Sequence, residues 1–73
     1  MDKNIYSSSA FISLLETQYN QTIPMIASMT KDDVKRLERV KNGVGYIGMR
    51  TYNSIRLQLE DIPLVDYDGS YKY

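Results

Sequence analysis

The segment of residues 22–38, TIPMIASMTKDDVKRLE, limits the fold more than any other part of the chain. Apolar residues at helical spacing precede and follow its centre: Ile23, Ile26, Val34 and Leu37. This spacing predicts two short helices joined by a tight turn at Met29. In the later of these two helices and the turn before it, four basic residues fall outside the apolar positions: Lys31, Lys35, Arg36 and Arg39. This later helix is therefore expected to pack through its apolar face and to present cations on the opposite face.

Composition excludes several classes of protein. Seventy-three residues allow one domain with one small core. The chain has no cysteine and no histidine, so it lacks thiolate and imidazole metal ligands and the most common general base. We therefore expect a non-enzymatic domain with no catalytic residues, metal, cofactor or small-molecule ligand. The absence of an apolar run of about 20 residues or of a signal peptide predicts a cytoplasmic protein that contacts no membrane.

Charge is unevenly distributed along the chain. The formal net charge is zero, but the segment from Lys31 to Arg56 contains seven of the nine basic residues and three acidic ones, a local charge of +4. Such segregation is typical of a surface that binds a polyanion such as DNA. A solvated charged helix produces the same pattern, and on charge alone the two interpretations are equally good.

The sequence predicts an all-α fold of four or five helices. The first helix is expected to begin at a cap formed by Ser8 or Ser9 and to run to about Tyr19. The second is expected to begin at a Thr22 cap and to end near Ser28, since the next residues carry the turn.

The third and fourth helices follow from local signals. Thr30 with Asp33 three residues later has the pattern of a capping box, so we expect Thr30 to cap the third helix. Asn42-Gly43 predicts its end, and the glycines nearby predict a loop over residues 44–49. An apolar stripe predicts the fourth helix over residues 51–62.

These elements divide the chain into a flexible arm (residues 1–8), a helix-turn-helix domain (9–62) and a tail (63–73). The tail is expected to be a short strand, a hairpin arm or a disordered arm, given its turn signal at Asp68-Gly69. The predicted core consists of Phe11, Leu14, Leu15, Ile23, Ile26, Val34, Leu37, Tyr52, Ile55 and Leu59.

The order and spacing of these signals resembles the phage lambda-repressor/Cro-like helix-turn-helix family. The resemblance is carried by Ile23 and Ile26, Ser28-Met29-Thr30, Val34, Leu37 and Glu38, Asn42-Gly43, and the segment from Thr51 to Leu59. It implies that the third helix enters the major groove of double-stranded operator DNA. It also implies two groups of contact residues.

The first group would meet base edges and comprises Thr30, Lys31, Asp32, Lys35 and Arg36. The second would meet phosphates and comprises Arg39, Lys41 and Arg50. For some of these residues a structural role is an alternative explanation. Thr30 would cap a helix whatever the function, and Asp32 suits the positive end of a helix dipole.

Two functions follow from the resemblance. The first is a small transcription regulator of a phage genetic switch, of the lysis–lysogeny type, that binds operator DNA through its third helix, as a monomer or as a homodimer. The second is an antirepressor that keeps this fold but binds a partner repressor protein. Overall neutrality and seven tyrosines suit the second, because tyrosine is favoured at protein interfaces. The fold alone does not choose between them.

Overall fold

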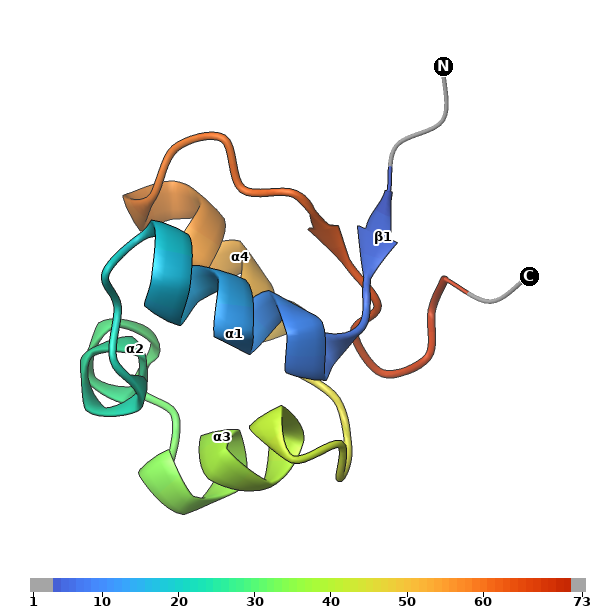
Figure 1. The fold of residues 1–73 in the computed structure, drawn as a ribbon, viewed down its shortest axis with the longest axis horizontal. Coiled ribbons are helices and arrows are strands. Elements are labelled where there is room, and N and C mark those ends of the chain that lie inside the picture. Colours follow the sequence, from blue (N-terminus) through green and yellow to red (C-terminus); the bar gives the residue numbers. More distant parts are fainter. Residues whose placement is uncertain (1–3, 72–73) are drawn as a thin grey trace.

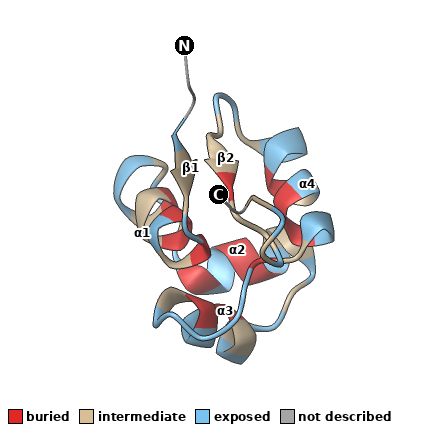
Figure 2. Cartoon of the chain, turned by 90° about the vertical axis from the view of Figure 1, so that its right-hand side faces the viewer, coloured by how far each residue is buried: buried red, intermediate tan, exposed pale blue. Residues whose placement is uncertain are grey.

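The computed structural model describes residues 4–71, which form four helices and two short strands around one core (Figure 1). Helix α1 packs against α3, and α2 packs against both α3 and α4. In Figures 1 and 2, α3 lies at one end of the molecule and the strand pair lies toward the other. The elements are β1 (Ile5–Tyr6), α1 (Ser8–Gln18), α2 (Ile23–Thr30), α3 (Val34–Lys41), α4 (Met49–Gln58) and β2 (Leu64–Val65).

The chain is mostly helical with four helices, as predicted, but it is not entirely helical. β1 and β2 form a parallel pair in which Ile5 lies opposite Leu64 and Tyr6 opposite Val65. The Asp66 N–H donates to the Tyr6 carbonyl over 2.8 Å and continues the pairing. The all-α prediction is wrong here because strands of two residues are too short to show an alternating pattern.

This strand pair corrects the prediction of a flexible arm over residues 1–8 and agrees with the short-strand alternative for the tail, since it joins residues 5–6 to residues 64–65. Val65 is fully buried, so β2 covers part of the core. The outermost parts of the predicted arms, residues 1–3 and 72–73, lie outside the described residues.

Buried hydroxyl groups hold the C-terminal segment in place. The Ser8 hydroxyl donates to the Asp66 carbonyl over 2.7 Å and accepts from the Ile47 N–H over 3.0 Å. The Tyr52 hydroxyl donates to the Pro63 carbonyl over 2.8 Å. Because a buried polar group without a partner is costly, the Ser8 bonds fix the tail and the α3–α4 loop to the start of α1, and the Tyr52 bond fixes the tail to α4.

The starts of the first two helices follow ordinary capping chemistry. The Ser7 hydroxyl caps α1 by accepting from the Ala10 N–H over 3.1 Å, so the prediction of Ser8 or Ser9 as the cap is wrong by one or two residues. The Thr22 cap of α2 is confirmed, with its hydroxyl accepting from the Met25 N–H over 3.4 Å. Helix α2 continues to Thr30, two residues beyond the predicted end.

The predicted Thr30 cap of the third helix is wrong. Thr30 is the last residue of α2, and its hydroxyl donates back to the Ile26 carbonyl over 2.8 Å. Lys31 then adopts a left-handed conformation (φ 59°), and α3 begins at Val34 after Asp33. Helix α2 continues for these two residues because Met29, three residues after Ile26, packs against the same core.

Helix α4 also differs from its prediction, since it begins at Met49 and ends at Gln58. Leu59 is already extended (φ −121°, ψ 144°), so the chain leaves the helix four residues before Pro63. The helix therefore does not end because of Pro63, which restricts the conformation only of the residue directly before it.

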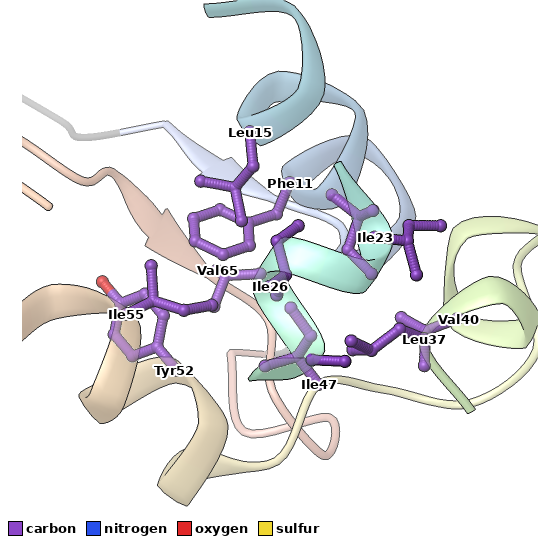
Figure 3. Packing of buried hydrophobic residues seen from close by; sticks show 12 residues of the cluster. Phe11, Leu15, Ile23, Ile26, Leu37, Val40, Ile47, Tyr52, Ile55 and Val65 are labelled. Atoms are coloured by element: carbon purple, nitrogen blue, oxygen red, sulfur yellow. The ribbon is translucent and has the colours of Figure 1, made fainter. Parts of the chain in front are cut away.

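Figure 3 shows the core, to which all four helices and β2 contribute. Seven of the ten predicted core residues are buried: Phe11, Leu15, Ile23, Ile26, Leu37, Tyr52 and Ile55. Leu14, Val34 and Leu59 are only partly buried. Buried residues outside the prediction are Ile12, Ala27, Val40, Ile47 and Val65. Helix α1 buries two adjacent residues, Phe11 and Ile12, and the Phe11 ring packs edge-on against Tyr52 of α4.

Candidate nucleic-acid interface

Two of the predicted base-reading residues, Asp32 and Arg36, bind each other. Arg36 Nε donates to Asp32 Oδ1 over 2.8 Å, and a terminal nitrogen of the same guanidinium pairs with Oδ2. Oδ2 also accepts from the Thr51 hydroxyl over 2.7 Å, and Oδ1 from the Asp33 N–H over 2.7 Å. The Asp32 side chain is only 11% exposed. Both carboxylate oxygens are therefore engaged within the fold.

The electrostatics of this pair favour its charged form. Hydrogen bonding from Arg36 holds the pKa of the Asp32 carboxyl well below its ordinary value, against the opposing effect of burial. The same bond raises the pKa of Arg36. The other terminal nitrogen of Arg36 donates to the Tyr46 carbonyl over 3.0 Å. The pair thus connects α3 to the α3–α4 loop and, through Thr51, to α4.

Lys41, a predicted phosphate contact, is also paired. Its ammonium lies 2.6 Å from Glu16 Oε1, which joins the end of α3 to α1. The backbone carbonyl of Lys41 accepts from the Ser9 hydroxyl. Lys41 therefore supports the packing of α1 on α3, and its charge is partly compensated by Glu16.

The outer face of α3 carries two of the predicted residues, Lys35 and Arg39. They lie one helical turn apart and are exposed, whereas Leu37 and Val40 point into the core. Within residues 4–71, neither Lys35 nor Arg39 forms an ion pair. Glu38 is exposed on the same helix, so the face is predominantly but not purely basic.

A surface hollow brings together the remaining predicted residues. It is lined by Thr30, Lys31, Asp32, Arg36, Arg50, Thr51 and Ser54. Lys31 and Arg50 are exposed at this hollow, on the α2–α3 turn and on α4 respectively. In the described part of the chain, neither is in an ion pair. The structure thus separates the predicted set into paired residues and exposed cations.

Exposed apolar residues near this region were not predicted as a group. Val44, Tyr46 and Met49 in or beside the α3–α4 loop are each about half exposed or more. The loop is nevertheless anchored, since the Val44 N–H donates to the Arg39 carbonyl over 2.8 Å. Leu57, on α4, is 88% exposed. Leu57 lies off the apolar stripe that marks the buried face of this helix, and that position is the sequence signal that indicates its exposure.

The described residues contain no group of three or more carboxylates placed to hold a metal ion. None of their helices has the length and apolar character needed to cross a membrane. No protein-family model, curated protein or solved structure matches the chain.

Proposed function

We propose that the chain is a small DNA-binding regulator that contacts duplex DNA through the outer face of α3 and the preceding turn. Lys31, Lys35 and Arg39 are the proposed contacts. The observation that carries this proposal is that Lys35 and Arg39 are exposed on the outer face of α3 without an ion pair among the described residues, whereas Asp32 and Arg36 neutralise each other. Unpaired cations on one face supply the sequence-independent part of DNA affinity.

The placement of α3 supports a helix-turn-helix interpretation. Three residues, from Lys31 to Asp33, separate α2 from α3, and both α1 and α2 pack against the inner side of α3. Leu37 anchors that inner side in the core. A helix held from behind with a polar outer face is the form that enters a major groove. Together with the resemblance to phage repressors, this favours an operator-binding role in a genetic switch.

The proposal assigns different roles to the predicted contact residues. Under this proposal Lys35, near the start of α3, would donate to a guanine edge, whereas Arg39 and Lys31 would meet phosphates. Asp32 and Arg36 hold the helix in position and read no base.

The experiment is a fluorescence-anisotropy titration of labelled duplexes, one containing the DNA that flanks the protein's own gene and one of scrambled sequence. Lys35→Ala and Arg39→Ala should each weaken binding. Lys41→Ala is the matched control, because Glu16 already compensates that lysine, and it should change affinity less than either. Equal effects of all three variants, or no binding by the parent, would refute the proposed face.

A second candidate function is the docking of a partner repressor, and one observation favours it. Val44 and Tyr46 present apolar surface on a loop that is fixed by bonds from Val44 and Arg36. Tyrosine on a fixed loop beside arginine is typical of the centre of a protein interface. On this account Tyr46→Ala should abolish binding to a repressor encoded beside the gene and leave DNA binding unchanged.

A further inference from the structure

An exposed asparagine–glycine pair, Asn42 and Gly43, directly follows α3. Asn42 is the C-cap residue of the helix, and its side chain is exposed. Gly43 has a φ of 92°, a left-handed conformation that glycine adopts easily. Apart from its chain neighbours, no heavy atom lies within 4 Å of the place that a Cβ atom on Gly43 would occupy. The peptide nitrogen after Asn42 is therefore not crowded by any side chain of its own residue.

An asparagine followed by glycine can modify itself without an enzyme. The Gly43 nitrogen attacks the side-chain carbon Cγ of Asn42 and forms a five-membered succinimide ring. The amide nitrogen leaves as ammonia and takes up the proton that the attacking nitrogen loses. Water then opens the ring at either carbonyl, which gives aspartate or isoaspartate. Either product carries a carboxylate where the amide was neutral.

Two hydrogen bonds hold the pair in its folded conformation and oppose this reaction. The Gly43 N–H donates to the Val40 carbonyl over 3.0 Å, and the Val44 N–H donates to the Arg39 carbonyl over 2.8 Å. The first of these bonds must open before the Gly43 nitrogen can attack. Helix ends open at a lower free energy than helix centres, and residues 42–46 are all exposed. Opening of this turn therefore does not require the core to open.

The other three asparagines of the chain lack this combination. Each is followed by a residue whose side chain crowds the peptide nitrogen: isoleucine after Asn4, glutamine after Asn20 and serine after Asn53. Asn53 also lies inside α4, where helical hydrogen bonds restrain the backbone on both sides. These asparagines are internal comparisons for the reactivity of Asn42.

We propose that Asn42 is a site of spontaneous deamidation, and that the modification weakens DNA binding through α3. The second half of this proposal rests on the proposed function. A carboxylate at position 42 lies one helical turn after Arg39, which forms no ion pair within residues 4–71. It compensates that cation and repels the phosphates that Arg39 is proposed to meet. It also stands at the C-terminal end of α3, where the helix dipole disfavours negative charge.

Peptide mapping by mass spectrometry, during incubation of the folded protein at neutral and mildly alkaline pH, tests the site. Aspartate and isoaspartate should accumulate at position 42 several-fold faster than at positions 20 and 53. The rate should rise with pH, because the attacking nitrogen must lose its proton. Asn42→Gln is the control, since its longer side chain would have to form a larger ring, and it should abolish the modification. A rate at Asn42 no higher than that at Asn53 would overturn the proposal.

The effect on DNA binding is tested with Asn42→Asp, which reproduces the charge of the product. Asn53→Asp is the matched control, because it adds the same charge at an exposed position of α4. Asn42→Asp should weaken binding to duplex DNA several-fold and more than Asn53→Asp does. Equal effects of the two variants would refute the second half of the proposal alone. A parent that binds no duplex would refute the proposed function and this second half together, whereas the mass-spectrometric result decides the modification site by itself.

Discussion

The carboxylate of Asp32 accepts hydrogen bonds from both Arg36 of α3 and Thr51 of α4. It thereby ties the start of one helix to the first turn of another across the surface hollow. Together with the buried Leu37 and Val40, this side chain holds the start of α3 in the position on which the proposed DNA contact depends.

Replacing Asp32 by asparagine should lower the free energy of unfolding by about 1–2 kcal/mol at neutral pH, a value reduced by solvent screening of the partly exposed Arg36. The pKa of Asp32 is depressed in the folded state, so its contribution is fully present above the unfolded value of about 3.9. It is lost as the pH falls below that value toward the folded pKa. Urea unfolding of parent and Asp32→Asn across this range should show the difference shrinking in acid.

Asp33→Asn is the control for this measurement. Asp33 is exposed and its side chain makes no capping bond, so the change should stay within about 0.5 kcal/mol. If Asp33→Asn destabilises the protein as much as Asp32→Asn, general helix-dipole effects rather than the Arg36 pair account for the result.

Lys31→Gly should stabilise the fold. Lys31 has a φ of 59° at the end of α2, a left-handed conformation that disfavours side chains with a Cβ. Glycine removes that strain but adds freedom to the unfolded chain, leaving a net gain of up to about 1 kcal/mol. Thermal unfolding measures it. Lys35→Gly, inside α3, should have the opposite sign, and a loss of stability in both variants would contradict the assigned conformation of Lys31.

Ser8→Ala should cost about 1–3 kcal/mol, because it leaves the buried Ile47 N–H without its partner and frees the Asp66 carbonyl. Chemical denaturation of this variant beside Ser28→Ala, an exposed position on α2, gives the comparison. Hydrogen exchange should also become faster at Ile47. Unchanged stability would mean that the hydroxyl does not secure the tail and the loop.

Much of the helical fold could be predicted because its signals are local. Thr22 caps α2 as its sequence context indicates, and the spacing of Phe11 with Leu15 or of Tyr52 with Ile55 marks buried faces. The burial of Val65 could not be predicted in this way. It depends on a two-residue pairing between β1 and β2, segments about sixty residues apart, and nothing in either segment specifies its partner.

The candidate site was predicted as a region rather than as a set of roles. The excess of basic residues between Lys31 and Arg56 identifies the surface. The distribution of charge along the sequence does not reveal that Arg36 forms an ion pair with Asp32 or that Lys41 forms one with Glu16. The first of these pairs joins residues four apart, a spacing that favours an ion pair along a helix, but the Thr51 hydroxyl that also binds Asp32 comes from α4, and no local signal indicates it.

The salt dependence of DNA affinity tests the central claim most directly. Each phosphate contact releases counterions and contributes about 0.9 to the slope of log affinity against log salt concentration. The account predicts that the parent binds duplex DNA with a slope that falls by about 0.9 in Arg39→Ala. It also predicts little change in slope for Lys41→Ala. An unchanged slope in Arg39→Ala, or no binding to any duplex even at low salt, would contradict DNA contact through the outer face of α3.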